Sequence, residues 1–420
     1  MIRILILADD LTGALDTGVT FACRSSSAVV YTGVPEDADT FFASSGAQAV
    51  VINTGSRHLL PEDAYQIVNR LSEAAVRAGV PFLYKKTDSA LRGNIGSELG
   101  GMRDAAPGSA LFFLPAAPSM NRIVRNSHLF IDGVPAENSA FGKDPRNPVR
   151  LSHIPSLLRE QYTGEGIRLY DSVSVRQMKE SFLSIMKDAP ASPVLFAGCF
   201  ELADILAEYL YGNKKELPPS CYQKQFRQFF VLCGSINPVS SAQADYAAGN
   251  GFCRRFLTWE QKLDPSWSSS PRAEEWVRQT SQLILDGKPV ILDCNTPPGE
   301  KPLSVCCQEK GLSEADASEL IPLSAAALAL RLMHNVPECT VMIIGGDTLQ
   351  AFLSLSGIGS LSPVGEAAPG TVISRVQLSG HPHLLLSKSG GFGKEQLLTE
   401  LTAAAGPIGS GTSGQHTQPH

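Results

Sequence analysis

The sequence lacks several features that would each point to a class of protein. None of its apolar runs approaches the roughly 20 residues needed to cross a bilayer. Its 35 Lys and Arg are outnumbered by 41 Asp and Glu, and it has no basic run of the kind that binds nucleic acid. The nine cysteines form no CxxC pair, which argues against zinc and favours reduced thiols. We expect a cytoplasmic protein without a membrane or nucleic-acid partner.

Length and composition indicate two globular domains. The chain has 420 residues, of which 43% are hydrophobic and 18% charged, so it exceeds one ordinary core and is not disordered. Residues 213–225 are polar and contain a Pro-Pro pair, which favours a boundary there. We therefore expect domains at 1–215 and 226–405. The Gly, Ser and Pro composition of 406–420 predicts a disordered tail.

Short apolar runs alternate with helical patterns along both halves. This alternation is typical of parallel sheets with crossover helices. The expected strands are residues 4–8, 28–31, 49–53, 82–85, 110–114, 167–170, 194–197, 229–233, 290–293, 341–344 and 383–387. Clear helical patterns cover 12–24, 61–78 and 318–334. The predicted fold class is α/β, with two α/β domains that each hold a mostly parallel, mixed sheet flanked by helices.

Two adjacent acids, Asp9 and Asp10, follow the first predicted strand. Ligands of open α/β sheets bind beyond the carboxyl ends of the strands. Two buried carboxylates there are costly without a partner, so they indicate a polar site in which one of them accepts a substrate proton or holds hydroxyls. The alternative is that Asp10 or Thr12 only caps the next helix, which would explain one acid but not both.

Two later loops carry groups suited to a small anion. Arg57 follows the third strand, where its guanidinium could bind a carboxylate in a bidentate manner; an exposed surface arginine is the alternative. The fourth strand runs into a segment that combines cations, hydroxyls and an acid. Its candidate site residues are Lys86, Thr87, Asp88, Ser89 and Arg92. Residues 133–148 form an irregular, polar run with several prolines, which predicts a long loop.

The second half has glycine-rich turns after three of its predicted strands. Backbone N–H groups at such turns can hold phosphate oxygens. The candidate nucleotide contacts are Ser235, Gly345, Gly346, Asp347, Thr348, Gly390 and Gly391. None of the turns matches the Walker A pattern, and the protein-kinase motifs are absent. The GxGxxG at 409–414 follows no strand, which argues against a dinucleotide fold.

Taken in order, these segments resemble the four-carbon acid sugar kinase family. The motifs that carry the resemblance are residues 8–14 (ADDLTGA), 86–94 (KTDSALRGN), 144–148 (DPxxP), 234–235 (GS), 345–348 (GGDT) and 388–393 (KSGGFG). The resemblance extends to about residue 405. It implies a sugar-acid-binding first domain and a nucleotide-binding second domain.

The resemblance also implies a reaction, with ATP phosphorylating the terminal hydroxyl of threonate, erythronate or 3-oxo-tetronate with Mg²⁺. We expect Asp9 or Asp10 to act on that hydroxyl, Arg57 and the lysines to hold the substrate carboxylate, and closure of the domains to exclude water. A sugar-acid-binding protein without activity and an NAD-dependent oxidoreductase are the alternatives. The metal ligands are not predicted, and a homodimer is left open.

Overall fold

The computed structural model describes the chain except residues 26, 145–146, 189–191, 214–225, 227 and 404–420. The predicted boundary at 213–225 and the predicted tail therefore lie almost wholly outside the described residues. The chain forms two compact units. The N-terminal unit contains Met1–Pro218 together with Ser356–Glu366 and Val372–Pro382, and the C-terminal unit contains the remainder. No described helix is long and apolar enough to cross a membrane.

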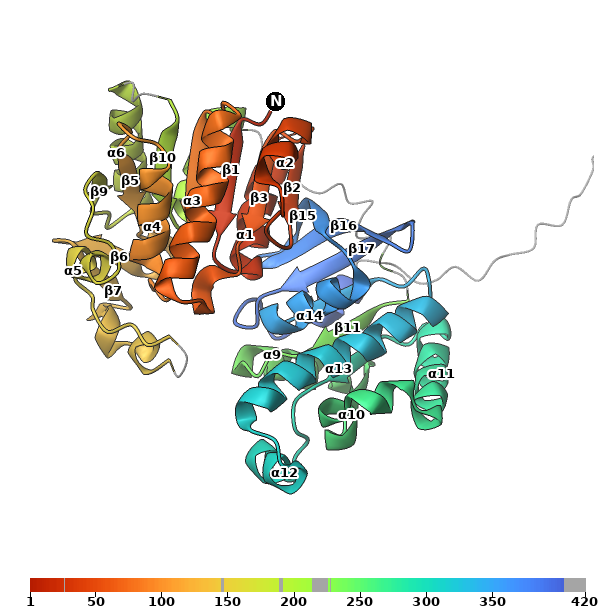
Figure 1. The fold of residues 1–420 in the computed structure, drawn as a ribbon. Coiled ribbons are helices and arrows are strands. Elements are labelled where there is room, and N and C mark those ends of the chain that lie inside the picture. The colour runs from red at the N-terminus through yellow and green to blue at the C-terminus, as the bar shows by residue number, and fades with distance from the viewer. Residues whose placement is uncertain (26, 145–146, 189–191, 214–225, 227, 404–420) are drawn as a thin grey trace, which may run out of the picture. The chain divides into compact units, whose positions relative to one another are not determined.

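The N-terminal unit is built on a mainly parallel sheet (Figure 1). From β2 the strand order is β2-β3-β1-β4-β10-β5-β9, and these strands pair in parallel. Their bounds are β1 Ile4–Ala8, β2 Ala28–Tyr31, β3 Ala49–Asn53, β4 Phe82–Lys86, β5 Leu111–Leu114, β9 Ile167–Leu169 and β10 Val194–Gly198. At the edge, β15 (Ser360–Ala368) pairs antiparallel with β2. Most of β16 (Thr371–Leu378) also belongs to this unit.

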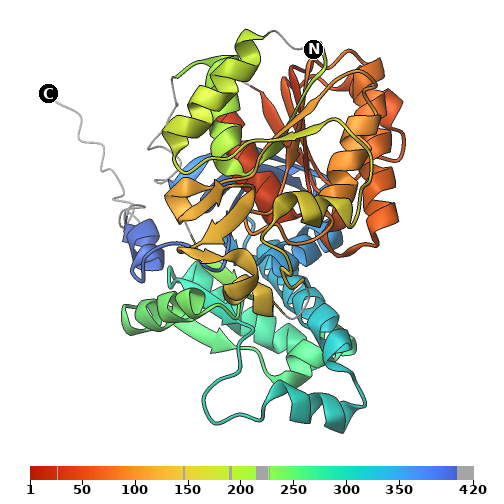
Figure 2. The same ribbon diagram turned by 90° about the vertical axis from the view of Figure 1, so that its left-hand side faces the viewer.

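Helices cover both faces of this sheet (Figure 2). On one face α2, α3 and α4 pack in sequence, and on the other α1 packs against α7 and α7 against α6. The bounds are α1 Leu11–Ala22, α2 Ala38–Ser44, α3 Pro61–Arg77, α4 Ile95–Asp104, α5 Ile154–Arg159, α6 Val175–Lys187 and α7 Phe200–Tyr211. Because the sheet is covered twice, the central strands are buried along their whole length, as in β1 and β3.

A small antiparallel sheet begins before the predicted loop at 133–148 and ends within it. Its strands are β6 (Arg122–Arg125), β7 (His128–Ile131) and β8 (Val134–Pro135). The loop prediction was wrong at β8. The sequence pattern did not reveal β6 and β7, because positive-φ residues, Asn126 and Ser127, make the tight turn between them without the usual glycine. Short 3-10 turns flank these strands: η2 Pro118–Met120, η3 Ala136–Asn138 and η4 Ala140–Lys143.

The C-terminal unit holds a second parallel sheet in the order β12-β13-β11-β14-β17. Its strands are β11 Phe230–Cys233, β12 Cys253–Phe256, β13 Val290–Asp293, β14 Val341–Ile344 and β17 His381–Lys388. The helices are α9 Pro238–Gly249, α10 Trp259–Leu263, α11 Pro271–Leu285, α12 Leu303–Lys310, α13 Glu314–Asn335, α14 Gly346–Ser356 and α15 Leu397–Ala403, with the turn η5 Pro265–Ser269. The predicted fold class is confirmed in both units.

Candidate functional site

In the N-terminal unit, Arg57 follows β3 and joins acids that follow two other strands, β1 and β4. Arg57 lies in the turn η1 (Ser56–His58), which follows β3. Its Nε lies 2.6 Å from Oδ2 of Asp9, and its Nη1 lies 2.6 Å from Oδ2 of Asp10. Its Nη2 lies 3.8 Å from Oδ1 of Asp88. The predicted residues after β1, β3 and β4 are therefore brought together as one cluster.

The two acids after β1 are held differently. Asp10 is the N-cap of α1: its Oδ1 accepts the N–H of Gly13 at 2.7 Å, while its Oδ2 pairs with Arg57. Asp9 is 2% exposed, and its Oδ1 has no hydrogen-bond partner among the described residues. Asp10 thus caps the helix and also belongs to the cluster, so the two readings of the sequence are compatible.

Charge keeps Asp9 and Asp88 ionised in spite of their burial. Burial opposes ionisation of Asp9, but Arg57, Lys85 and Lys86 outweigh it and hold the pKa of Asp9 below its usual value. Burial acts in the same direction on Asp88, where hydrogen bonds from Arg92 and the charges of Arg57 and Arg92 lower the pKa well below the ordinary range. Both acids are therefore anchors of charge rather than proton acceptors near neutral pH.

Arg92 extends the cluster to the segment after the small sheet. Its Nη2 lies 2.9 Å from Asp88 Oδ1, and its Nη1 lies 3.0 Å from Asp144 Oδ2. Ser89 accepts a hydrogen bond from Arg122 of β6. Asp144 begins the DPxxP motif, of which residues 145–146 lie outside the described residues. The small sheet thus contributes a cation that the sequence pattern did not single out.

A fully buried ion pair lies below this cluster. Lys85 Nζ is 3.1 Å from Glu98 Oε2, and both side chains have no exposed surface. Ser56 donates to Glu98 and is itself 2.7 Å from Thr54, whose hydroxyl donates to the carbonyl of Ala8. This network links α4, β3, β4 and the end of β1. Sequence reasoning missed Glu98 because it lies in a helix, away from any strand end.

Lys86 and Thr87 lie at the carboxyl end of β4. Lys86 is 7% exposed and its Nζ donates to the carbonyl of Thr87 at 2.8 Å. A Cβ added to Gly13 would lie 3.4 Å from Lys86 Nζ, so the glycine lets this ammonium approach the first turn of α1. Thr87 is fully buried, and its N–H donates to the carbonyl of Gly198 at 2.9 Å.

A further acid, Asp16, was missed by sequence reasoning. It lies on the half-buried face of α1 with Thr12 and Thr20, which are four residues away on either side. Burial raises the pKa of Asp16 to about 7; Lys86 opposes this, and the charges of Asp10 and Glu366 add to it. Its four-residue spacing from Thr12 could have revealed it as a polar position on an otherwise apolar helix.

In the C-terminal unit, the three predicted glycine-rich turns meet. A Cβ on Gly390 would lie well under 3.0 Å from Ser235 Oγ, and one on Gly234 would overlap Thr348 Oγ1 in the same way. Gly345 has φ +115°, and its Cβ would lie 3.3 Å from the backbone nitrogen of Ser235. Only glycine allows this approach. The turns after β11, β14 and β17 therefore form one close-packed loop cluster, with Gly346 and Asp347 opening α14.

Buried side chains fix the shape of these loops. Lys388 Nζ donates to the carbonyls of Ser389 and Gly390 at 2.9 and 3.3 Å, and Ser240 donates to Gly390 at 2.7 Å. Gln243 binds the carbonyls of Phe392 and Lys394. Burial lowers the pKa of Lys388 to about 8. The last predicted contact, Gly391, lies beside Asn237. A Cβ added to Gly391 would lie 3.4 Å from Asn237 Nδ2.

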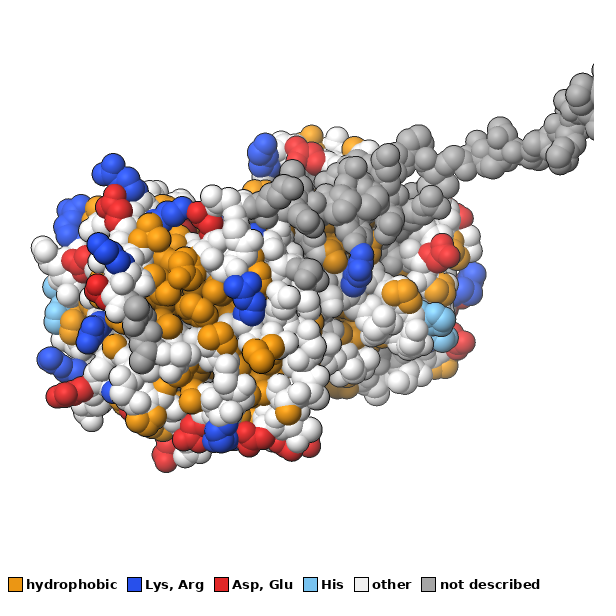
Figure 3. Space-filling view, turned by 90° about the horizontal axis from the view of Figure 1, so that it is seen from above, with side chains coloured by type: hydrophobic (Ala, Val, Ile, Leu, Met, Phe, Trp, Pro, Cys, Tyr) orange, Lys and Arg blue, Asp and Glu red, His pale blue; other side chains and the backbone are white. Residues whose placement is uncertain are grey.

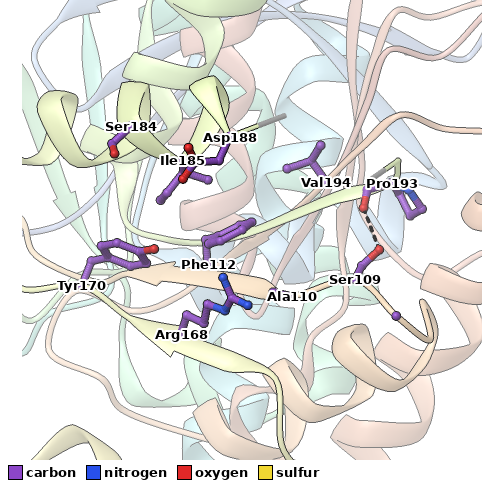
Figure 4. A pocket seen from close by; sticks show the side chains of 11 residues that line it. Ser109, Ala110, Phe112, Arg168, Tyr170, Ser184, Ile185, Asp188, Pro193 and Val194 are labelled. Atoms are coloured by element: carbon purple, nitrogen blue, oxygen red, sulfur yellow. Dashed lines mark hydrogen bonds between the residues drawn. The ribbon is translucent and has the colours of Figure 1, made fainter. Parts of the chain in front are cut away.

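Two hollows lie at the opposite, amino end of the N-terminal sheet. One of about 250 Å³ is lined by Phe112, Arg168 and Tyr170 (Figure 4), where Ser109 donates to the carbonyl of Pro193 at 3.1 Å. The other is lined in part by Met1 and Phe42, and Figure 3, seen from above, shows apolar side chains gathered over the N-terminal unit. Neither hollow contains a predicted site residue.

Two family models cover most of the chain. A sugar-binding N-terminal domain matches residues 4–194, and a nucleotide-binding C-terminal domain matches residues 230–398. A D-threonate kinase of Bordetella bronchiseptica is 27% identical, over 95% of this chain and 96% of its own. A D-threonate kinase of Salmonella typhimurium is 24% identical, over 95% and 97%. A 3-oxo-tetronate kinase of Actinobacillus succinogenes is 24% identical, over 93% and 96%.

Solved structures share the fold. A protein from Salmonella typhimurium LT2 has a TM-score of 0.76 at 22% identity and covers 95% of this chain and 98% of its own. A protein from Haemophilus influenzae has a TM-score of 0.72 at 21% identity, covering 96% and 100%. With both family domains present in order and kinases as full-length relatives, the chain belongs to the four-carbon acid sugar kinase family and is a carbohydrate kinase.

Proposed function

We propose that this kinase transfers the terminal phosphoryl group of ATP to the terminal hydroxyl of a four-carbon sugar acid. The observation that carries this is the Arg57 cluster, in which cations and acids from three adjacent strand ends converge. Sugar acids need both kinds of partner, because the carboxylate binds cations and the hydroxyls donate to carboxylates. D-Threonate, D-erythronate and 3-oxo-tetronate are the substrates that the names of its relatives suggest.

Within this cluster we assign each group a part in substrate binding. Lys86 and Arg92 hold the substrate carboxylate, with the polar groups of Thr87 and Ser89 beside them. The buried Oδ1 of Asp9 has no hydrogen-bond partner among the described residues, and it accepts a substrate hydroxyl. Asp10, whose two oxygens are held by Gly13 and Arg57, positions the substrate. Arg57 fixes both acids and adds positive charge.

The glycine-rich loop cluster of the C-terminal unit is the proposed ATP site. Its glycines keep side chains out of the place where the loops meet, and backbone N–H groups at the start of α14 suit phosphate oxygens. Lys388 holds the turn after β17 through two carbonyls. Ser235 and Thr348 offer hydroxyls beside these backbone groups. The proposed nucleotide contacts are thus those predicted from the sequence.

Mg²⁺ fits this site as an ion bound mainly by the phosphates of the nucleotide. The residues that the structure describes contain no group of three or more metal-ligating acids, histidines or cysteines. Mg²⁺ commonly binds phosphates and water with one or two carboxylates, and Asp347 at the start of α14 is the carboxylate that could serve. When bound, the ion neutralises charge on the triphosphate. A cytoplasmic location and a homodimer remain proposals, the first resting on the need for ATP.

A coupled ADP-release assay over a panel of four-carbon acids tests the proposal. We expect ATP-dependent turnover with at least one of the three acids, and little ADP release when the acid is omitted. Five- and six-carbon sugar acids serve as matched controls, since they carry the same groups on a longer chain. Binding of the acids without ADP release would contradict the proposal.

A further inference from the structure

We propose that Arg122 of β6 binds the carboxylate of the sugar acid and that Phe141 positions its side chain for this contact. This inference rests on the proposed function and adds two residues to the sugar-acid site. Neither is among the residues predicted from the sequence, because Arg122 begins a strand of the small sheet and Phe141 lies in the turn η4.

The backbone of Arg122 is fixed near the end of β5. Its N–H donates to the carbonyl of Ala117 at 3.1 Å, and its carbonyl accepts the N–H of Ala117 at 2.7 Å. Its side chain reaches the segment after β4, where its Nη1 donates to Oγ of Ser89. Ser89 directly follows Asp88, the acid that pairs with Arg92. The Arg122 guanidinium therefore lies beside the cluster to which the sugar acid is assigned.

Arg122 differs from the other arginines of this cluster in its counter-charges. Arg57 and Arg92 each form ion pairs of 2.6–3.0 Å with two acids. Within the described part of the chain Arg122 pairs with no carboxylate, although it is half-buried, and Ser89 accepts from one of its five N–H donors. A charge withdrawn from water is costly without a partner, and a substrate carboxylate is the partner that a guanidinium binds most strongly.

Phe141 contacts the arginines on both sides of Ser89. The guanidinium carbon of Arg92 lies 5.2 Å from the centre of the Phe141 ring, and that of Arg122 lies 4.8 Å from it. The face of an aromatic ring attracts a cation within about 6 Å. The two guanidinium groups repel each other, and the shared ring offsets part of this repulsion. Unlike an acid, the ring holds Arg122 in place without neutralising its charge.

The turn η4 fixes the position of Phe141. Its N–H donates to Oγ of Ser139 at 3.2 Å, and its carbonyl accepts the N–H of Asp144 at 3.3 Å. Asp144 also pairs with Arg92 at 3.0 Å. The segment from 139 to 144 thus gives Arg92 both an acid and a ring, whereas it gives Arg122 the ring alone. The positive charge of Arg122 is therefore kept for the substrate.

The first test replaces Arg122 in the full-length chain. The KM values of ATP and of the four-carbon acid that the wild type turns over best are measured for Arg122→Gln and Arg122→Lys. We expect Arg122→Gln to raise the acid KM at least about tenfold, as for the loss of a hydrogen bond to a charged group, with the ATP KM changed less than about threefold. Arg122→Lys should regain part of the affinity for the acid. Arg125→Gln, at an exposed position of the same strand, is the matched control.

The second test separates positioning from packing at Phe141. Phe141→Tyr keeps an aromatic ring, and its acid KM should stay near that of the wild type. Phe141→Leu keeps an apolar side chain without the ring, so its acid KM should rise at least about threefold while kcat and the ATP KM change little. In an Arg122→Gln background the same change should have a smaller effect on the acid KM, because the ring acts partly through Arg122.

The outcomes that would overturn the inference differ from those that concern the reaction. An acid KM of Arg122→Gln within about threefold of the wild type, or an equal rise in both KM values, would overturn the role of Arg122. Equal acid KM values for Phe141→Leu and Phe141→Tyr would overturn the role of Phe141, and this comparison decides the matter if Arg122→Gln does not fold. Absence of turnover by the wild type on every four-carbon acid would overturn the proposed function as well.

Discussion

The Nε of Arg57 lies 2.6 Å from Oδ2 of Asp9, and the Asp9 side chain is almost wholly buried. A buried acid that loses its cation costs several kcal/mol. We therefore expect Arg57→Ala to lower the free energy of unfolding by about 3 kcal/mol and to raise the KM of the sugar acid more than that of ATP. Denaturant unfolding and steady-state kinetics measure the two effects.

Arg77→Ala is the control for this variant. Arg77 pairs with Asp39 at 3.0 Å, but its side chain is 55% exposed, so its loss should cost less than about 1 kcal/mol. If Arg57→Ala raised the KM of ATP more than that of the acid, Arg57 would belong to the nucleotide site instead.

The buried pair of Lys85 and Glu98 gives a second prediction. Glu98→Gln removes the carboxylate that pairs with the buried Lys85 ammonium, and we expect a loss of about 3–5 kcal/mol in unfolding free energy. Replacing both residues, as in Lys85→Met with Glu98→Leu, should recover much of this loss. Chemical denaturation measures both variants.

The protonation state of Glu98 decides how much stability the Glu98→Gln variant loses. Burial, with a smaller effect of Asp9, raises the pKa of Glu98, while Lys85 acts against them. Glu275→Gln, which removes an exposed pair with Arg278, is the control and should change the unfolding free energy little, because exposed ion pairs contribute little to stability. An equally small effect of Glu98→Gln would mean that Glu98 is protonated in the folded chain.

Gly390→Ala tests the nucleotide loops. The added methyl group would overlap Ser235 Oγ, so the turn after β17 must shift. We expect the KM of ATP to rise at least about tenfold, the equivalent of about 1.4 kcal/mol, with the acid KM little changed. Gly249→Ala, where no atom lies within 4 Å of the added Cβ, is the control. Equal changes in both KM values would indicate general damage instead.

The raised pKa of Asp16 predicts that the stability of the chain depends on pH. Its pKa is about 7 in the folded chain against a reference value of 3.8, so the folded state binds the proton more tightly. Stability from this group is complete below pH 4 and is lost as the pH rises towards 7. At pH 8 the unfolding free energy of Asp16→Asn should therefore exceed that of the wild type by roughly 2 kcal/mol, allowing for partial solvation. If the difference in stability between Asp16→Asn and the wild type were the same at pH 5 and pH 8, the raised pKa of Asp16 would be contradicted.

The central strands were predicted well, because a short run of apolar residues marks each buried strand locally in the sequence. The buried runs at Ile4–Ala8, Ala49–Asn53 and Val341–Ile344 were predicted with the observed bounds. The sequence pattern did not reveal β12, whose residues are all half-buried, or β15, which joins the N-terminal sheet from far along the chain. Alternation of apolar residues cannot report such distant pairing.

In the candidate site, too, local features could be predicted from the sequence and contacts between distant residues could not. Residues after strand ends, such as Asp9, Arg57 and Asp88, could be predicted because the carboxyl ends of parallel strands meet at one edge. Their mutual ion pairs could not, since pairing depends on side-chain direction. Asp16 and Glu98 lie within helices and become notable only when burial and neighbouring charges are known.

The identity of the phosphorylated product tests the central claim most directly. The reaction of ATP with the best four-carbon acid is followed by phosphorus and proton NMR. The account predicts one phosphate monoester, on the terminal carbon of the acid, formed in equal amount to ADP. Free phosphate in place of the ester, or an ester at another carbon, would contradict it.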